Sequence, residues 1–256
     1  MITTPDPLVA RLRAAGCVYA EEEARLLRAT GHEGVELEAL VAARVAGSPL
    51  EPLLGWVELC GRRLVVQPGV FVPRQRTALL VRVAAQRVRA RSVLVELCCG
   101  AAPVAALVPA DEVHAADLCE VAAECARLNV PHGQVHVGDL YDALPPRLRG
   151  RVDVLVANAP YVPTAEIATM PPEARDHEPV RALDGGADGV VLHRRIAAGA
   201  PEWLAPGGAL LIETSAGQAE LTTEAMAAAG LRTSMVVDDT IGSCVLVGVW
   251  PGGPAG

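Results

Sequence analysis

The stretch VDVLVANAPY, Val152 to Tyr161, decides the fold class because it joins an apolar run to a short, stiff turn. An apolar run of this length that ends at a turn containing Pro is typical of a buried strand in a parallel sheet. In open α/β sheets, ligands bind beyond the carboxyl ends of such strands. An amide, a backbone carbonyl and an aromatic ring at this place can hold a planar nitrogen nucleophile. The same residues suit an ordinary strand-ending turn, so the local pattern leaves both interpretations open.

Strands and helices are expected to alternate on both sides of this stretch. Before it, the pattern predicts strands at 93–97, 113–116 and 135–137, with helices at 103–108 and about 118–129. After it, the pattern predicts helices at 189–204 and 218–229, and strands at 209–213, 232–237 and 243–249. This alternation predicts an α/β fold with a doubly wound, mostly parallel sheet. The last two strands are too close in sequence for a crossover helix, which predicts one antiparallel strand.

The N-terminal part has a different pattern. Residues 6–46 predict three short amphipathic helices, 48–52 a linker, 56–66 a β-hairpin, and 77–89 a helix that follows Pro73. We therefore expect a small helical domain at 1–50, a linker and hairpin at 51–73, and the α/β domain at 74–256. Aromatic residues make up 3% of the chain, so its core is expected to be aliphatic.

The composition excludes several classes of function. All 22 basic residues are Arg, and the absence of Lys excludes a lysine Schiff base and a Walker-type phosphate-binding lysine. A net charge of −8 without a basic, aromatic-rich cluster argues against a nucleic-acid partner. No apolar stretch reaches the roughly 18 residues of a transmembrane helix, and the N-terminus lacks a signal-peptide pattern. We expect a cytoplasmic protein without membrane attachment.

The cysteines and histidines have no spacing typical of a metal site, and we predict none. The seven cysteines form no CxxC pair, which predicts free thiols in a reducing compartment. The six histidines are expected to be structural or solvated. His177, next to Glu178-Pro179, is the one histidine expected near the site.

Further motifs, together with the turn after the central strand, resemble those of a known enzyme family. Asn158-Ala159-Pro160-Tyr161 is similar to the Asn-Pro-Pro-Tyr motif of S-adenosylmethionine-dependent methyltransferases that alkylate amide or exocyclic amino nitrogens. Other segments narrow the resemblance to the HemK/PrmC family of protein-(glutamine-N5) methyltransferases: Glu51-Pro52-Leu53 with Gly55, Pro68 to Arg74 with Thr77, Glu178-Pro179, Ala182 to Gly186 with Asp188-Gly189, and Trp203 to Gly208. The resemblance covers residues 50–250. It implies a Rossmann-like class I methyltransferase domain, with S-adenosylmethionine as cofactor and S-adenosyl-L-homocysteine as product.

The resemblance implies a cofactor loop after the strand at 93–97. Glu96 stands at the family's acidic position and Gly100 at the middle glycine of a glycine-rich loop. Cys98 and Ala102 occupy the two other glycine positions. A positive φ at either residue would cost about 1–2 kcal/mol, so the departure weakens the prediction of tight cofactor binding.

The resemblance places the remaining cofactor contacts at later strand ends. Asp117, with Leu118, is expected to bind the ribose hydroxyls, and Asp139, with Leu140, the adenine edge. Asn158 is expected to contact the cofactor as well. On local grounds Asp117 also suits a helix N-cap, and Asp139 also suits a solvated turn.

The catalytic residues implied by the resemblance lie in the turn Asn158–Tyr161. The Asn158 side-chain oxygen and the Ala159 backbone carbonyl are expected to accept the two amide protons of a glutamine, with Tyr161 packed against the amide plane. Ala159 replaces the family's first proline, which loosens the turn before Pro160 by up to about 1 kcal/mol. The substrate-binding residues implied are Phe71, Pro73, Arg74, Thr77, Tyr161 and Glu178.

These observations predict a methyltransferase that acts on a glutamine side chain in a protein, with a peptide chain release factor as one candidate partner. The Pro-, Gly- and acid-rich loop at 164–188 is expected to cover the substrate. Ala78 stands where the family has an acidic residue, so the sequence favours a divergent relative of the release-factor enzyme. An enzyme acting on a small metabolite and a non-catalytic binding protein remain alternatives. We expect a monomer or weak dimer.

Overall fold

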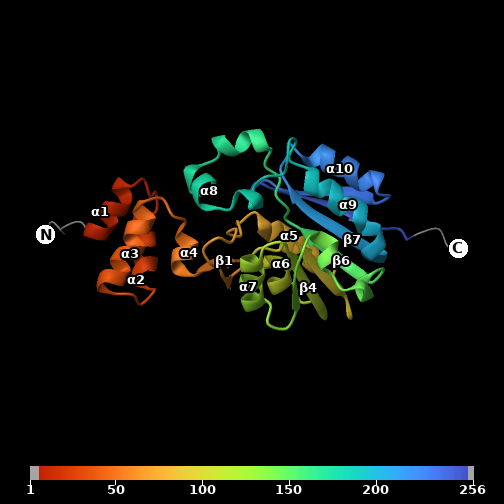
Figure 1. Cartoon of the computed structure of the whole chain (residues 1–256), viewed down its shortest axis with the longest axis horizontal. Coiled ribbons are helices and arrows are strands. Elements are labelled where there is room, and N and C mark those ends of the chain that lie inside the picture. Colours follow the sequence, from red (N-terminus) through yellow and green to blue (C-terminus); the bar gives the residue numbers. More distant parts are fainter. Residues whose placement is uncertain (1–5, 253–256) are drawn as a thin grey trace.

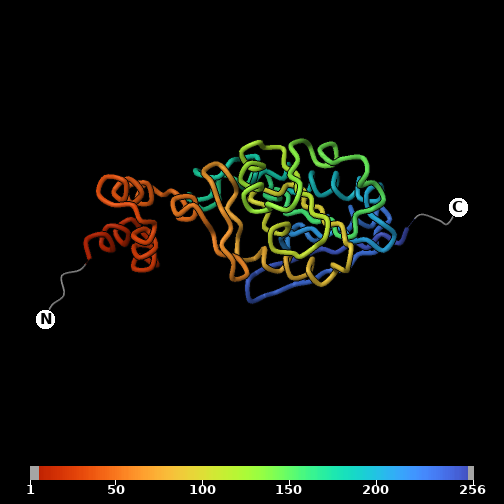
Figure 2. The backbone as a smooth tube through the Cα atoms, turned by 90° about the horizontal axis from the view of Figure 1, so that it is seen from below, coloured from red at the N-terminus to blue at the C-terminus, as the bar shows by residue number. Residues whose placement is uncertain are grey.

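The computed structural model describes residues 6–252, which extend from a helical N-terminal end to a larger α/β domain (Figures 1 and 2). The segment in which we expect no signal peptide lies partly outside these residues. The first helices are α1 (Pro7–Ala14), α2 (Ala20–Arg28) and α3 (Gly34–Val45). They pack around a small aliphatic core that includes the fully buried Leu12 and Leu27. The prediction of three helices in this part is confirmed.

The segment after α3 is a helix where we expected a linker. Helix α4 (Leu50–Leu54) follows Pro49 and ends at Gly55, whose φ is +80°. Pro favours the start of a helix and a left-handed Gly favours its end, so both boundary residues support this short turn of helix. The expected linker at 48–52 was therefore wrong.

The predicted hairpin is confirmed and is fixed to the main domain. Strands β1 (Trp56–Leu59) and β2 (Arg62–Val65) are antiparallel. Cys60 and Gly61 between them both have positive φ, as a tight hairpin turn requires. The Asn129 side chain accepts from the Val65 N–H at 2.7 Å and donates to the Val65 carbonyl at 2.9 Å. These bonds anchor the hairpin on the helix that ends at Asn129.

The main sheet has the strand order β5-β4-β3-β6-β7-β9-β8. Its strands are β3 (Val93–Leu97), β4 (Glu112–Asp117), β5 (Gln134–Val137), β6 (Val152–Ala157), β7 (Leu204–Thr214), β8 (Arg232–Asp238) and β9 (Ser243–Val249). Strand β9 is antiparallel to both of its neighbours, and the pairs from β5 to β7 are parallel. The mostly parallel sheet with one antiparallel strand is confirmed. Because the chain order reverses on either side of β3, the β3–β6 boundary is the topological switch point, where such folds bind ligands.

Strand β7 is longer than expected. It begins at Leu204 and includes Pro206-Gly207-Gly208, which we predicted to be a turn before the strand. The pairing with β6 shifts between Val152 and Val154, so the extra residues form an irregularity inside the ladder. Gly207 and Gly208 bond to the backbone of Trp250, which explains why the segment stays in the sheet.

Helices cover both faces of the sheet (Figure 1). One face carries α5 (Thr77–Ala85), α6 (Pro103–Leu107) and α7 (Glu120–Asn129), and the other carries α9 (Val191–Trp203) and α10 (Ala219–Ala228). Helix α5 ends four residues before the predicted boundary. The largest fully buried side chains are all Leu or Ile, as expected for a core poor in aromatic residues. Among residues 6–252, no helix is long and apolar enough to cross a membrane.

The segment between β6 and α9 is folded into three short helical turns: η3 (Thr164–Thr169), α8 (Pro172–His177) and η4 (Val180–Ala182). An ion pair of 3.0 Å joins Glu173 in α8 to Arg44 in α3. Arg44 also pairs with Glu23 of α2 at 2.6 Å. The N-terminal helices are thus in direct contact with this segment.

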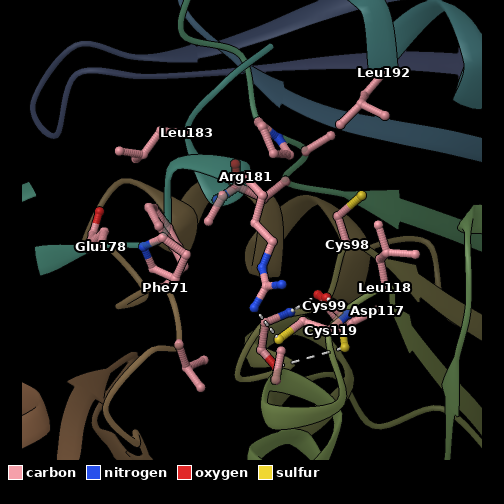
Figure 3. A pocket seen from close by; sticks show the side chains of 18 of the residues that line it. Phe71, Cys98, Cys99, Asp117, Leu118, Cys119, Glu178, Arg181, Leu183 and Leu192 are labelled. Carbon is pink, nitrogen blue, oxygen red and sulfur yellow. Dashed lines mark hydrogen bonds between the residues drawn. The ribbon is translucent and has the colours of Figure 1, made fainter. Parts of the chain in front are cut away.

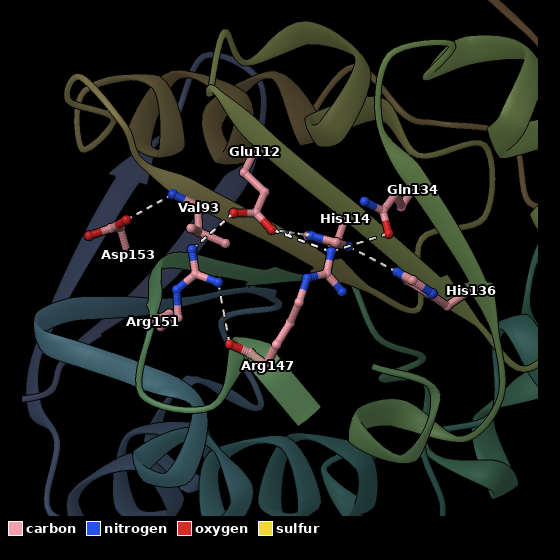
Figure 4. Close-up of polar contacts among 8 residues, drawn as sticks. All are labelled: Val93, Glu112, His114, Gln134, His136, Arg147, Arg151 and Asp153. Atoms are coloured by element: carbon pink, nitrogen blue, oxygen red, sulfur yellow. Dashed lines mark hydrogen bonds and ion pairs between the residues drawn. The ribbon is translucent and has the colours of Figure 1, made fainter. Parts of the chain in front are cut away.

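A polar network around the buried His114 joins strands β4 and β5 (Figure 4). His114 Nδ1 lies 2.9 Å from His136 Nε2, and His114 Nε2 lies 3.1 Å from a Glu112 oxygen. Arg151 donates to the other Glu112 oxygen at 3.2 Å. Burial lowers the pKa of both histidines. These contacts hold the two strands together, so these two histidines are structural, as predicted.

Candidate active site

A cavity of about 500 Å³ lies at the carboxyl ends of β3, β4 and β6 (Figure 3). Its lining includes the following predicted site residues: Phe71, Pro73, Arg74, Thr77, Glu96, Cys98, Gly100, Asp117, Leu118, Asp139, Leu140, Asn158, Ala159, Pro160, Tyr161 and Glu178. Ala102 is the exception, because it is fully buried in the core under α5 and α6. Its prediction as a cofactor contact was therefore wrong. The residues brought together come from segments far apart in the sequence.

The loop after β3 adopts the left-handed conformation at three alternating positions. The φ angles are +52° at Cys98, +53° at Gly100 and +53° at Ala102. Glycine adopts this region without cost, whereas each residue with a Cβ is strained by about 1–2 kcal/mol. The loop thus keeps the shape of a glycine-rich loop although two of its positions lack glycine.

Two acidic side chains hold this loop in place from within. The buried Glu96 carboxyl accepts from the Val104 N–H at 3.3 Å and the Ala105 N–H at 2.6 Å, at the start of α6. Burial raises the pKa of Glu96 to about 8, and these two hydrogen bonds oppose the rise. Asp117 accepts from the Gly100 N–H at 2.9 Å, so it connects the ends of β3 and β4.

Asp117 and Asp139 differ in the contacts that their carboxylates make. Asp117 also accepts from the Cys119 N–H at 2.9 Å, but α7 begins at Glu120 with Cys119 as its N-cap. Asp117 is therefore not the N-cap of this helix. Asp139 pairs with Arg195 at 2.8 Å, and both side chains are about half exposed. Asp139 is thus an ion-paired residue at the rim of the cavity.

The turn after β6 presents its polar groups to the same cavity. Asn158 Nδ2 donates to Thr77 Oγ1 at 3.4 Å, so the amide nitrogen is directed to α5. The backbone of the next residues is enclosed by the loop at 183–189, because Val162 N–H donates to Leu183 O at 3.0 Å. A Cβ at Gly185 would lie 2.7 Å from Tyr161 Cα. The Gly-rich motif therefore permits a close approach of backbone to the turn.

The opposite wall of the cavity connects two motifs that are distant in sequence. Arg74 donates to Glu178 at 2.6 Å, and the Glu178 side chain is only 2% exposed. The Arg74 guanidinium also lies over the Phe71 ring, 5.5 Å from its centre. Burial raises the pKa of Glu178, and the Arg74 charge opposes that rise. This contact fixes the segment at 178–183 beside the cavity.

Several residues of the cavity were not predicted. Arg181 extends from η4 to Cys119, where its Nη2 donates to the Cys119 sulfur at 2.8 Å (Figure 3). Arg76, Met170 and Leu192 also line the cavity. No sequence signal marks Arg181, because its contact with Cys119 depends on the path of the loop between β6 and α9.

The histidine near the site is His193. Its ring centre is 6.5 Å from that of Tyr161, and its Nδ1 is 2.8 Å from the Thr222 hydroxyl. Burial lowers the pKa of His193 to about 4, so the ring is neutral at pH 7. His177 is not among the residues that line the cavity, and its ring faces Gly47. The expectation for His177 was wrong because α8 turns it toward the N-terminal helices.

All seven cysteines are free thiols. Burial and the nearby Asp117 carboxylate raise the pKa of Cys98 to about 12. Because the thiolate is the nucleophilic form, Cys98 is inert at neutral pH. The described residues contain no group of three side chains suited to holding a metal ion.

Comparison with known proteins identifies relatives of this chain. It is 34% identical over 217 residues to the release factor glutamine methyltransferase of Geobacter sulfurreducens, covering 82% of this chain and 75% of that protein. It is 40% identical to the release factor glutamine methyltransferase of Streptomyces coelicolor, covering 68% of this chain and 65% of that protein. The 4-amino-L-phenylalanine/4-methylamino-L-phenylalanine methyltransferase of Streptomyces pristinaespiralis is 36% identical to this chain. The match covers 68% of this chain and 63% of that protein. No family model matches the chain.

Solved structures share the fold at low sequence identity. A methyltransferase from Pyrococcus furiosus superposes with a TM-score of 0.57 at 16% identity, covering 75% of this chain and 90% of that one. The Mtq2–Trm112 complex of E. cuniculi, described as methylating the termination factor eRF1, gives a TM-score of 0.51 at 20% identity, covering 71% and 99%. These likenesses show the class I methyltransferase fold. The sequence relatives confirm the predicted resemblance: the chain belongs to the release factor glutamine methyltransferase family.

Proposed function

We propose that this protein transfers a methyl group from S-adenosylmethionine to the side-chain amide nitrogen of a glutamine in a protein, with a peptide chain release factor as the first candidate. The observation that carries the proposal is the position of Asn158 and Ala159 in the cavity, beside the loop that follows β3. One amide oxygen and one backbone carbonyl are the two acceptors that a primary amide requires.

The cavity has the properties of a cofactor site. Its volume lies within the roughly 300–1,000 Å³ of small-molecule sites. The left-handed loop Cys98–Ala102 lets backbone approach a ligand closely, as phosphate- and nucleoside-binding loops do. Asp117 and Asp139 supply carboxylates for ribose and adenine, and Leu118 and Leu140 supply apolar contacts beside them. When bound, S-adenosylmethionine supplies an activated methyl group.

The residues of this chain would hold the acceptor amide in position and stabilise the charge that develops on its nitrogen. An amide nitrogen is a poor nucleophile, because its lone pair is delocalised into the carbonyl group. Asn158 Oδ1 and the Ala159 carbonyl would accept its two protons and stabilise the positive charge that develops on nitrogen. The Tyr161 ring would pack against the amide plane, and Pro160 restricts the turn. No general base is needed before the methyl transfer.

Two parts of the chain would contact the substrate. Phe71, Pro73 and Arg74 would contact the substrate from one wall, with Thr77 and Glu178. The helices of the proposed recognition domain at 1–50 meet the covering loop through the Arg44–Glu173 ion pair. We propose a cytoplasmic monomer or weak dimer whose main partner is a protein, without a role for nucleic acid.

The test is transfer of labelled methyl groups to a release factor domain that carries the Gly-Gly-Gln loop. We expect labelling of the wild-type domain and none of a domain in which that glutamine is Ala. Asp117→Ala should weaken the binding of S-adenosylmethionine at least tenfold by calorimetry, because the carboxylate bonds are lost. A folded wild-type protein that binds no S-adenosylmethionine up to millimolar concentration would contradict any methyltransferase activity.

A second candidate is N-methylation of an amino group on a small metabolite. The 36% identity to the 4-amino-L-phenylalanine methyltransferase supports it, as does the replacement of the family's proline by Ala159. Labelling of free 4-amino-L-phenylalanine, without labelling of the release factor domain, would favour this candidate. Cofactor binding without transfer to either acceptor would favour a binding protein.

A further inference from the structure

A buried carboxyl group lies behind the catalytic turn and has no role in the proposal above. Glu213 stands near the end of β7, and its side chain is 1% exposed. Ala157 of β6 pairs with Ile212 of β7, so Asn158 and Glu213 follow at adjacent strand ends. Neither Glu213 oxygen has a hydrogen-bond partner among the described residues. A buried carboxyl group without a hydrogen-bond partner lowers the stability of the fold. Its position next to the site therefore points to a functional role.

Two residues at the start of α5, Arg76 and Thr77, line the cavity and also lie near Glu213. Thr77 is fully buried, and its hydroxyl is near enough to Glu213 to lower the pKa of that carboxyl. The same hydroxyl is the group that Asn158 Nδ2 faces at 3.4 Å. Arg76 Nε lies 3.8 Å from Glu213 Oε1, and its side chain is 44% exposed. The Thr77 side chain is thus near both Glu213 and Asn158.

The other neighbours of Glu213 limit what it can contact. Tyr161 is close enough that a charge on Glu213 raises the pKa of its phenol. On the far side, Glu213 pairs in the sheet with Val245 of β9, and Cys244 follows opposite Thr214. Arg76 is therefore the cation that faces the carboxyl group, while Tyr161 and Cys244 are the neutral titratable groups near it. Burial raises the pKa of Glu213 to about 7, and Thr77 and Arg76 oppose the rise.

We propose that Glu213 is a positioning residue, which sets the orientation of the Asn158 amide through the Thr77 hydroxyl. The role rests on the proposed function, because Asn158 is the residue that would hold the acceptor amide. A carboxylate only accepts hydrogen bonds, so an ionised Glu213 would draw the one O–H of Thr77 toward it and form the hydrogen bond that its oxygens lack in the structure. The oxygen of Thr77 then accepts from Asn158 Nδ2, and Asn158 Oδ1 faces the cavity. This is the orientation that an incoming primary amide requires.

Protonation of Glu213 removes this preference. A protonated carboxyl donates to Thr77, and the Thr77 O–H is then free to donate toward Asn158. A flipped Asn158 would accept that bond and turn its NH₂ group to the cavity, where it opposes the protons of a substrate amide. We call the hydrogen bonds from Asn158 through the Thr77 hydroxyl to Glu213 the relay. The relay holds Asn158 Oδ1 toward the cavity when Glu213 is ionised and fails to do so when Glu213 is neutral.

The direct test observes the Asn158 side-chain amide by NMR. The chain contains two asparagines, Asn129 and Asn158, so asparagine-selective ¹⁵N labelling gives two side-chain NH₂ groups. Asn129 donates to the carbonyls of Val65 and Ala101, both at 2.9 Å, and serves as an internal control. We expect the Asn158 signals to titrate between pH 6 and 8 in the wild-type protein and to stay constant in Glu213→Gln. The Asn129 signals should stay constant in both.

Further variants keep the test decisive if Glu213→Gln is poorly folded. Thr77→Val removes the hydroxyl and should abolish the titration of Asn158, while Thr77→Ser should restore it. Thr214→Val is the matched control, because Thr214 is also buried on β7 with an unpartnered hydroxyl. It should leave the titration unchanged. A constant Asn158 signal in the wild-type protein, or a titration that persists without Glu213 or without the Thr77 hydroxyl, would overturn the proposal.

Kinetics with a labelled acceptor give an independent readout. Glu213→Gln should lower kcat about tenfold at pH 8 with KM within threefold, and it should remove the fall in kcat below pH 7. The combined Glu213→Gln and Thr77→Val variant should lose no more than Thr77→Val alone, because both act through one relay. Unchanged kcat and pH dependence in Glu213→Gln would overturn the proposal. The NMR result needs no acceptor, so a missing acceptor contradicts only the proposed function.

Discussion

The loop Glu96–Pro103 after β3 and the turn Asn158–Tyr161 after β6 lie at neighbouring strand ends and face the same cavity. The loop contains its own strain, since Cys98 and Ala102 have a positive φ without being glycine. The turn has no residue with positive φ, and its shape depends on glycines in another segment that approach Tyr161 closely. The shape of the loop thus rests on its own strained backbone together with Glu96 and Asp117, whereas the shape of the turn depends on contacts from the loop at 183–189.

The largest effect is expected for Asn158→Ala in the turn. This change removes the amide oxygen proposed to accept an acceptor proton, and loss of one such group costs about 10²–10³ in kcat. Affinity for S-adenosylmethionine should fall less than tenfold, because Asp117 and the strained loop remain. Single-turnover methyl transfer and calorimetry measure the two quantities. An unchanged kcat would remove Asn158 from the catalytic residues.

The pH dependence of stability should separate the two regions. His193 beside the turn has its pKa lowered to about 4, below the ordinary value of 6.5. Between these two values the unfolded chain therefore binds more protons than the folded chain. The free energy of unfolding falls by about 3 kcal/mol as pH falls from 6.5 toward 4. Glu96 in the loop has its pKa raised from 4.5 to about 8, so the folded chain holds one proton more between these values, and stability falls as pH rises from 4.5 to 8.

Urea unfolding at pH 5, 6.5 and 8 measures both contributions. His193→Gln should make the protein more stable at pH 5 than at pH 6.5, because only the Glu96 contribution remains there, and Glu96→Gln should remove the fall in stability between pH 6.5 and 8. If His193→Gln alters only the alkaline side, or if neither variant changes the profile, the assignment of the two slopes is wrong.

Gly189→Ala tests whether tertiary contacts impose the shape of the turn. A Cβ at Gly189 would overlap the carbonyl oxygen of Tyr161, and φ there is +79°. We expect kcat to fall about 10²-fold, because misplacing a positioning group by about 1 Å has effects of that size. Gly207→Ala is the matched control, since its φ is +81° and a Cβ there meets nothing within 4 Å. Equal losses in both variants would assign the effect to backbone strain alone.

The smallest effect is expected for Ala102→Gly in the loop. Relief of the left-handed strain should exceed the added entropy of the unfolded chain, raising the free energy of unfolding by about 1 kcal/mol or less. Arg91→Gly is a suitable control, because Arg91 also has positive φ but lies outside the site. Both variants should gain stability, and only Ala102→Gly should alter cofactor affinity, through the shape of the loop, because Ala102 itself does not line the cavity. A loss of stability in Ala102→Gly would mean that the buried methyl group and the entropy of the unfolded chain outweigh the strain at this position.

Sequence patterns predicted the local elements and the motifs at strand ends with few errors. The helix α4 and the long β7 were missed because their boundaries depend on Gly55 and on bonds to Trp250. Ala102 was expected in the cavity because it stands at a glycine position of the family loop. Its burial under α5 and α6 follows from packing that no motif records.

The sequence by itself determined the alternation of strands and helices, the aliphatic core, and the polar residues that end β3, β4 and β6. These features depend on side-chain period and on residues next to each other in the chain. Only the tertiary structure decided that Glu213 stands behind Thr77 and Asn158, that Arg181 reaches Cys119, and that His193 lies beside Tyr161. Such contacts join segments more than 30 residues apart. They are set by the order of strands in the sheet and by the path of the loop between β6 and α9, which the local sequence does not specify.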